Sequence, residues 1–466
     1  MFPGFHRNLA HSEARGFSFA PQPFQQFAAN RQAAKNDCPV AAPRRRGTYN
    51  GVKLEDAVMA IIETDVESDV GSQDLDGGLE DSALEDCRFD TLALHAGAYP
   101  DPTTGAILTP IYQTTTFRQA AVGQDKGYTY SRSANPTVSA LERRLAALEG
   151  AEFCTCYGTG LAATTALCLA LLASGDRVVC SQAVYGGTVR LFREVLAKFG
   201  VTAEFVDTSE EEAFVNALSK PTRFCFIETP ANPTLRVTDL RLAALLTHEA
   251  KSLLVIDNTL LTPALQRPFE FGADIVLHST TKFIEGHNAT VGGALVTRDP
   301  ELHDKLAFAR NAIGAIQSPF PAWLTLQGVK TLPLRMSRHS ENALQIARFL
   351  MAHERVTKVI YPGLESFPQF ELVQRQQKSG GALIAFEVEG GVEAGIRLMN
   401  SVRLCALAEN LGAAETIITH PASMTHADVP RAQREAAGIT DGLVRLSVGL
   451  ESSLDLIGDL AQALKC

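Results

Sequence analysis

The sequence has no long hydrophobic run, a single tryptophan among its 466 residues and few cysteines for its length. Its longest apolar run, residues 161–173, contains two threonines, whereas a membrane helix needs about 20 apolar residues. The nine cysteines are odd in number and have no repeating spacing, which excludes a disulfide framework and favours a reducing compartment, the cytoplasm. A net charge of −10 argues against a nucleic-acid-binding protein. We therefore expect neither a membrane nor a nucleic-acid partner.

Charge is unevenly distributed along the chain. Residues 1–52 carry seven Arg or Lys and two acidic residues, whereas residues 53–87 carry twelve Asp or Glu and one Lys. Neither block has the hydrophobic periodicity of a packed element, so we predict a disordered N-terminal extension over residues 1–88. The basic block is also compatible with a transit peptide, which remains an alternative.

From Phe89 onwards, apolar strand-like segments alternate with helix-like segments. Asn135 and Pro136 predict the start of a helix whose apolar stripe ends at Gly150. The predicted strands are 177–180, 203–206, 224–227, 253–256, 274–277 and 294–296. This alternation predicts an α/β fold with a mostly parallel central sheet and helices on both faces. A helix around 342–353 and strands at 382–388 and 443–448 predict a smaller C-terminal α+β domain over 335–466.

Two of the predicted strands are followed by residues that suit pyridoxal phosphate (PLP) chemistry. Asp257 follows strand 253–256 and Lys282 comes shortly after strand 274–277, and ligands of open parallel sheets bind beyond the carboxyl ends of the strands. There a lysine can bind PLP covalently while a carboxylate pairs with the protonated pyridine nitrogen. Gly160 opens a predicted helix whose first N–H groups suit a phosphate. Taken singly, these residues also fit a cap, a surface charge and a turn.

Four longer segments resemble the transsulfuration family of PLP-dependent enzymes of cysteine and methionine metabolism. They are YSRSANPT at 130–137, ETPANPT at 228–234, STTKFIEGH at 279–287 and HPASMTH at 420–426, in the order found in the family. The resemblance runs from about Phe89 to the C-terminus. It implies an aminotransferase-like fold (fold type I), small amino-acid substrates and a homotetramer with active sites shared between subunits. It also implies an N-terminal arm over 89–134 that reaches a neighbouring subunit, and a large PLP-binding domain over 135–334.

The resemblance also implies roles for the matched residues. Lys282 would bind PLP and then carry protons, Asp257 would keep the pyridine nitrogen protonated, and Tyr185 would stack on the ring, so that these three form the catalytic set. Further residues would bind the 3′ oxygen or the phosphate of PLP: Asn232, Gly160, Leu161, Ser279, Thr281 and, from the neighbouring subunit, Tyr130 and Arg132. Arg445 would bind the α-carboxylate of the substrate through its two-pronged guanidinium.

Four positions bear on the substrate. Gly187 replaces the cysteine that methionine γ-lyases carry, which disfavours that activity. Arg190 and Glu409 match the residues that bind the far end of cystathionine in the family, whereas Asn410 departs from the serine found there. The prediction is a cystathionine γ-synthase, which joins an O-acyl-L-homoserine to L-cysteine. Cystathionine γ-lyase or β-lyase, an O-acylhomoserine sulfhydrylase and an inactive PLP-binding scaffold remain alternatives.

Two pairs of residues are interpreted as structural. Cys154 and Cys156 have no partner pair at metal-ligand spacing, so we predict buried packing and no metal site. Arg335 and Arg338 lie on a predicted helix and are expected to be surface or domain-junction charges.

Overall fold

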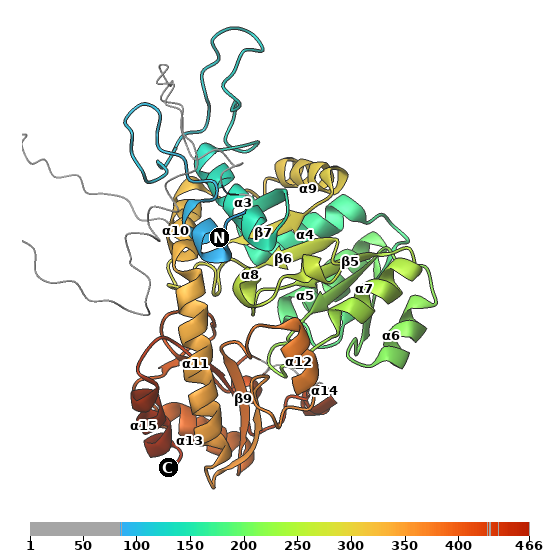
Figure 1. Cartoon of the computed structure of the whole chain (residues 1–466). Coiled ribbons are helices and arrows are strands. Elements are labelled where there is room, and N and C mark those ends of the chain that lie inside the picture. Colours follow the sequence, from blue (N-terminus) through green and yellow to red (C-terminus); the bar gives the residue numbers. More distant parts are fainter. Residues whose placement is uncertain (1–83, 85, 426, 428–429, 437, 466) are drawn as a thin grey trace, which may run out of the picture. The chain divides into compact units, whose positions relative to one another are not determined.

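The computed structural model describes residues 84, 86–425, 427, 430–436 and 438–465 (Figure 1). Most of the predicted extension over 1–88 lies outside the described residues, as does His426 of the fourth motif. Leu84 is buried, and its carbonyl accepts a hydrogen bond from the backbone N–H of Cys87 at 3.0 Å. Helix α2 (Phe89–His95) follows directly.

A seven-stranded sheet forms the first layer, in the order β1-β7-β6-β5-β4-β2-β3. Its strands are β1 (Phe153–Tyr157), β2 (Arg177–Ser181), β3 (Thr202–Val206), β4 (Phe224–Glu228), β5 (Leu253–Asp257), β6 (Ile275–His278) and β7 (Gly293–Thr297). Within this sheet β7 runs antiparallel to β1 and β6, and the other pairs are parallel. The predicted mostly parallel sheet is confirmed, and its six predicted strands agree to within one residue at each end. β1 was not predicted, because Thr155 and two cysteines interrupt its apolar pattern.

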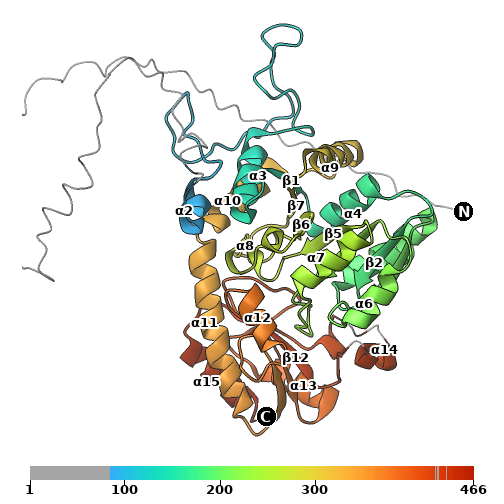
Figure 2. The same cartoon turned by 45° about the vertical axis from the view of Figure 1, so that its right-hand side comes forward.

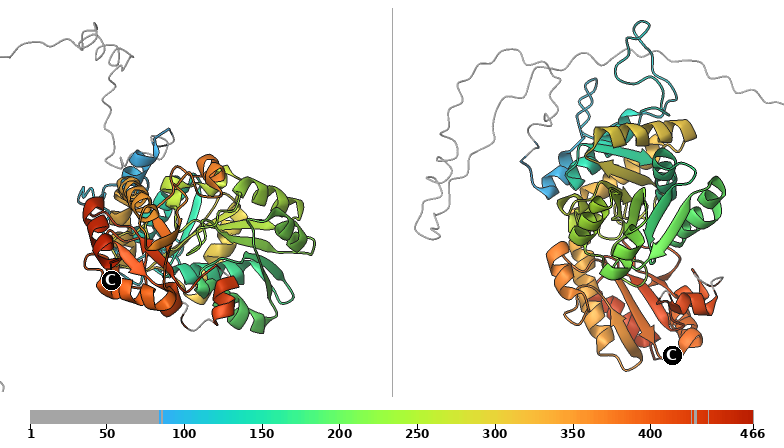
Figure 3. Two further views of the ribbon diagram at one scale, coloured as in Figure 1. Left: turned by 90° about the horizontal axis from the view of Figure 1, so that it is seen from below. Right: turned by 90° about the vertical axis from the view of Figure 1, so that its right-hand side faces the viewer.

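Helices cover both faces of this sheet, as predicted (Figures 2 and 3). They are α3 (Pro136–Glu149), α4 (Gly160–Leu171), α5 (Gly186–Arg190), α6 (Glu211–Leu218), α7 (Leu240–Glu249), α8 (Thr262–Leu265), α9 (Pro300–Ile313) and α10 (Pro319–Lys330). Successive strand residues point to opposite faces. Val178 and Phe226 therefore pack in the cluster that includes residues of α4 and α9, whereas Val179 and Ile227 pack with α6 and α7.

Helix α3 forms for the local reasons that the sequence indicates. The side chain of Asn135 accepts a hydrogen bond from the N–H of Thr137 at 3.0 Å, and Pro136 occupies the first turn. Gly150 ends the helix with φ of +71°, a left-handed conformation that glycine adopts without steric cost. The predicted limits of this helix are confirmed.

A second, five-stranded sheet has the order β10-β11-β12-β9-β8. Its strands are β8 (Val356–Ile360), β9 (Leu383–Val388), β10 (Ala406–Leu407), β11 (Ile417–Thr419) and β12 (Leu443–Ser447). The helices that accompany it are α11 (Leu332–Met351), α12 (Phe370–Gln376), α13 (Gly391–Ser401), α14 (Arg431–Ala436) and α15 (Ser453–Ala463). Because α11 is one continuous helix, the predicted boundary between 334 and 335 falls inside it. Among the described residues, no helix is both long and apolar enough to cross a membrane.

The segment between α2 and α3 is mostly irregular. Figures 1 and 2 show it as loops that extend beyond α3. One bridge joins Thr116 to Tyr130, and the segment exposes large apolar side chains, among them Ile107 and Val122. The side chains of Ile107 and Val122 are almost fully exposed.

Candidate active site

The candidate site lies where β4, β5 and β6 end. Asp257 is the last residue of β5 and is buried, and its Oδ1 accepts a hydrogen bond from the N–H of Thr259 at 3.1 Å. Glu228, the last residue of β4, pairs with Asp257 in the register of the sheet. Lys282 lies in the turn that follows β6. The carboxylate and the lysine therefore come from the same edge of the sheet, where ligands of such folds bind.

The amino group of Lys282 is directed towards the second sheet. Its Nζ donates a hydrogen bond to Oδ1 of Asn410 at 2.5 Å. Burial, with a further contribution from the positive charge of Arg445, lowers the pKa of Lys282 to about 8. A substantial fraction of the amine is therefore neutral near physiological pH. Only the neutral amine attacks a carbonyl, and a pKa in this range also suits a group that exchanges protons.

Two opposing influences act on Asp257. Burial raises the pKa of its carboxyl group, whereas the hydrogen bonds from Thr259 and the charge of His278 oppose that rise. His278 is itself buried, with Nε2 2.6 Å from Oε1 of the buried Glu149. This pair could not be predicted from the sequence, because Glu149 belongs to α3 and His278 to β6. Because the charge of His278 lowers the pKa of Asp257, it favours the ionised carboxylate that a protonated pyridine nitrogen needs.

The beginning of α4 and the turn after β6 form a small anion cradle. Thr159 caps the helix by accepting from the N–H of Ala162 at 2.9 Å, while the N–H groups of Gly160 and Leu161 in the first turn have no acceptor inside the helix. A Cβ on Gly160 would lie 2.8 Å from Cβ of Ser279, so only glycine allows this approach. Two backbone donors, a helix N-terminus and the Ser279 hydroxyl are therefore placed to bind a phosphate.

The hydroxyl of Thr281 is already engaged within the chain. It donates to the carbonyl of Gly292 at 3.2 Å and accepts from the N–H of the same residue at 3.0 Å. It thereby fixes the turn that carries Lys282 to the start of β7. Its contact with the phosphate of PLP remains a prediction.

Arg445 on β12 is buried beside Lys282. Its Nη1 donates to Oδ1 of Asn232 at 3.2 Å, and its Nη2 donates to the carbonyl of Asn410 at 2.8 Å and to Thr419 Oγ1 at 3.1 Å. Burial lowers the pKa of Arg445 to about 10, against the opposing charge of Glu409, so it is charged at neutral pH. Its buried Nε has no hydrogen-bond partner among the described residues. A buried cation with a donor to spare suits the carboxylate of a substrate.

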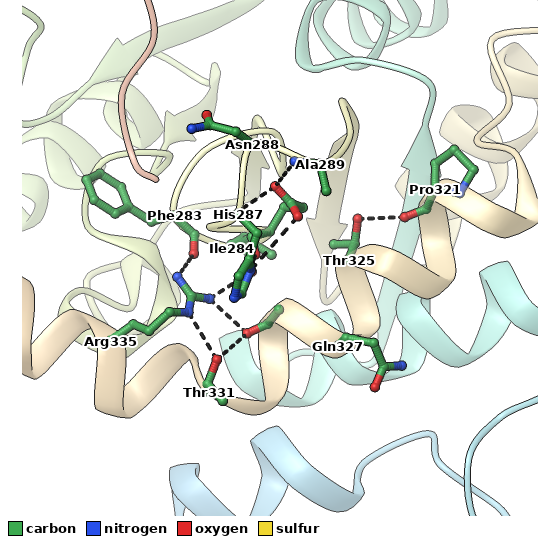
Figure 4. Close-up of polar contacts among 12 residues, drawn as sticks. Phe283, Ile284, His287, Asn288, Ala289, Pro321, Thr325, Gln327, Thr331 and Arg335 are labelled. Atoms are coloured by element: carbon green, nitrogen blue, oxygen red, sulfur yellow. Dashed lines mark hydrogen bonds and ion pairs between the residues drawn. The ribbon is translucent and has the colours of Figure 1, made fainter. Parts of the chain in front are cut away.

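Arg335 and Arg338 were expected to be surface or domain-junction charges; a surface position is wrong for Arg335, whose side chain is buried, whereas Arg338 is exposed. Figure 4 shows the Arg335 guanidinium among backbone carbonyls. It donates to Phe283 O at 2.6 Å, Ile284 O at 3.1 Å and Gly328 O at 2.8 Å. Arg335 therefore anchors the turn directly after Lys282 to the start of α11.

The remaining predicted residues lie near the site or apart from it. Tyr185 and Asn232 both donate their backbone N–H to Glu228. Four others have exposed side chains, and no hydrogen bond or ion pair within the described chain joins them to the site: Tyr130, Arg132, Arg190 and Glu409. The Arg132 guanidinium instead lies 5.7 Å from the ring centre of Tyr130. Cys154 and Cys156 are buried in β1, as expected for packing.

Taken together, these groups fit PLP. The cradle of Gly160, Leu161 and Ser279 suits the phosphate, Asp257 suits the pyridine nitrogen, and the amine of Lys282 suits the aldehyde. All three are the groups that the sequence assigned to the cofactor.

Comparison with known proteins agrees with this assignment. The family model for "Cys/Met metabolism PLP-dependent enzyme" matches residues 90–465. The chain is 45% identical over 381 residues to a cystathionine gamma-lyase of Dictyostelium discoideum, covering 81% of this chain and 98% of the relative. It is 46% identical over 375 residues to a cystathionine gamma-synthase of Mycobacterium tuberculosis, covering 80% and 96%.

The fold of this chain is also similar to that of a solved structure. The cystathionine gamma synthase of Xanthomonas oryzae pv. oryzae, in complex with aminoacrylate and cysteine, superposes with a TM-score of 0.79 at 44% identity, covering 81% of this chain and 98% of that one. The match confirms the predicted fold type I. This chain therefore belongs to the PLP-dependent enzymes of cysteine and methionine metabolism, the transsulfuration family.

Proposed function

We propose that this enzyme is a cystathionine γ-synthase. It joins an O-acyl-L-homoserine to L-cysteine, forming the C–S bond of L-cystathionine and releasing the carboxylic acid. Related enzymes carry synthase and lyase names alike, so the proposal depends on the site. The observation that carries it is that Asn410 contacts both Lys282 and Arg445, which places a proton carrier beside a carboxylate receptor.

PLP, when bound, supplies an electron sink for the bonds at the α-carbon of the substrate. The guanidinium of Arg445 binds the α-carboxylate and fixes the orientation of the amino acid. Lys282 takes the α-proton at Nζ and returns protons to the neighbouring carbons, because its pKa of about 8 lets both forms of the amine exist at neutral pH. Asn410, which stands where the family typically has a serine, accepts a hydrogen bond from this amine.

Arg190 and Glu409 serve the second substrate. Both side chains are exposed and form no hydrogen bond with other described residues, so their charges are available to a ligand. Glu409 also lies close enough to Arg445 to raise its pKa. In this proposal Glu409 binds the amino group of cysteine and Arg190 binds its carboxylate, which selects a thiol that is itself an amino acid.

The site is completed by a neighbouring subunit. Tyr130 and Arg132 belong to an irregular segment that exposes Ile107 and Val122, and among the described residues no hydrogen bond or ion pair joins them to the cradle of their own chain. A partner subunit would cover these apolar side chains and receive both polar ones at its phosphate. We infer a homotetramer built from such pairs.

The test is a substrate panel with identification of products by mass spectrometry. The PLP-loaded enzyme should form cystathionine from O-succinyl- or O-acetyl-homoserine and cysteine faster than it breaks cystathionine down. Glu409→Ala should lower this synthesis by about 10- to 150-fold, the value of a charge-assisted hydrogen bond, while elimination from O-acylhomoserine alone changes little.

Glu393→Ala, which replaces an exposed glutamate of α13, is the matched control and should leave both reactions unchanged. Dominant breakdown of cystathionine in the unmodified enzyme would assign a lyase instead. Equal losses in both reactions for Glu409→Ala would favour a sulfhydrylase that uses a small inorganic thiol source.

A further inference from the structure

Glu228 is a buried carboxylate to which the mechanism above assigns no role. It ends β4, only 6% of its surface is exposed, and its register partner on β5 is Asp257. Burial and the neighbouring charge of Asp257 raise the pKa of Glu228, whereas the two backbone N–H groups that donate to it act in the opposite direction and favour the carboxylate. A carboxylate in this place is unfavourable, and a glutamine of the same shape would remove the charge.

Its two oxygens bind two different loops of the site. Oε2 accepts the backbone N–H of Tyr185 at 2.7 Å, and Oε1 accepts the backbone N–H of Asn232 at 3.0 Å. The N–H of Glu228 itself donates to Oγ of Ser181 at 3.1 Å, which ties the end of β2 to the same point. One side chain thus joins two loops that lie far apart in the sequence.

Both loops carry side chains that depend on this backbone. The Tyr185 ring lies so close to Gly187 that a Cβ there would overlap it, so the ring follows the course of the turn. Oδ1 of Asn232 accepts from Nη1 of Arg445, so the loop after β4 also sets the position of the carboxylate receptor. A shift of either backbone would move a group that faces the cofactor or the substrate.

We propose that Glu228 is a positioning residue that sets the ring of Tyr185 and the amide of Asn232 together for PLP. The carboxylate is required because each N–H uses a different oxygen. A glutamine offers one acceptor oxygen, and its NH₂ group would face the second N–H donor. This inference rests on the roles in binding PLP that the resemblance to the family implies for Tyr185 and Asn232.

The test measures PLP affinity by absorbance titration of the apoenzyme, before any substrate is added, so the result does not depend on which reaction the enzyme catalyses. Glu228→Gln should raise the dissociation constant of PLP about 10-fold, as expected for the loss of one hydrogen bond. Glu228→Asp keeps both oxygens and should give a smaller loss. Asp274→Asn is the matched control, because Asp274 accepts the N–H of Leu254 at the opposite edge of the same sheet. It should bind PLP like the unmodified enzyme.

A double-mutant cycle separates positioning from general destabilisation. If Glu228 acts through Asn232, Glu228→Gln should cost much less PLP affinity in an Asn232→Ala background than in the unmodified enzyme. Unchanged PLP affinity in Glu228→Gln would overturn the proposal. So would an equal loss in Asp274→Asn, strict additivity in the cycle, or full PLP affinity in both Tyr185→Ala and Asn232→Ala.

Discussion

The lowered pKa of Lys282 predicts how the apoenzyme takes up PLP as the pH changes. An amine at its ordinary pKa of 10.5 is roughly 0.1% neutral at pH 7.5, whereas one with a pKa of about 8 is roughly a quarter neutral. Because only the neutral amine attacks the aldehyde, burial increases the reactive fraction by about two orders of magnitude. The rate of covalent attachment should therefore rise with pH and level off, with a midpoint near 8.

Stopped-flow absorbance, with apoenzyme and PLP mixed across a pH series, measures this midpoint. Arg445→Met removes the positive charge that helps to lower the pKa of Lys282, so its midpoint should move to higher pH. Burial remains, so the midpoint should stay below 10.5. A midpoint near 10.5 in the unmodified apoenzyme, or a downward shift in Arg445→Met, would refute the reasoning.

Three further predictions follow from the site. Arg335→Met leaves the carbonyls of Phe283 and Ile284 without their Arg335 donor and should cost about 3 kcal/mol of unfolding free energy in chemical denaturation, whereas the exposed Arg338→Met should cost almost nothing. Arg132→Ala and Lys282→Ala should each be inactive alone, yet mixed subunits should regain activity; no recovery in verified hybrids would contradict a shared site. Asn410→Ala removes the acceptor of the Lys282 amine and should lower kcat with unchanged PLP content.

Local patterns in the sequence predicted much of the fold. The apolar runs of the central strands and the cap at Asn135 depend on neighbouring residues alone, so their positions could be read directly. β8 could not be identified in this way, because its central residues are exposed and carry no apolar run. β10 and β11 are only two and three residues long, which is too short to show a hydrophobic period.

The residues that support the site could not be predicted from the sequence, because their partners are distant along the chain. The sequence pattern predicted a surface or domain-junction charge for Arg335, because its contact with the turn after Lys282 joins residues that are distant in the sequence. Glu228 was part of a matched motif, but its contact with Tyr185 depends on how β2 and β4 lie side by side. The residues proposed to bind the cofactor could be matched to a family motif. The side chains that position them could be identified only from the structure.

We propose that Lys282 is the residue that binds PLP covalently. Reduction of the PLP-loaded enzyme with borohydride, followed by proteolysis and peptide mass spectrometry, locates the attached cofactor directly. We expect one pyridoxyl group per chain, on the peptide that contains Lys282, and none in Lys282→Ala. Stoichiometric labelling of a different lysine in the unmodified enzyme would contradict it.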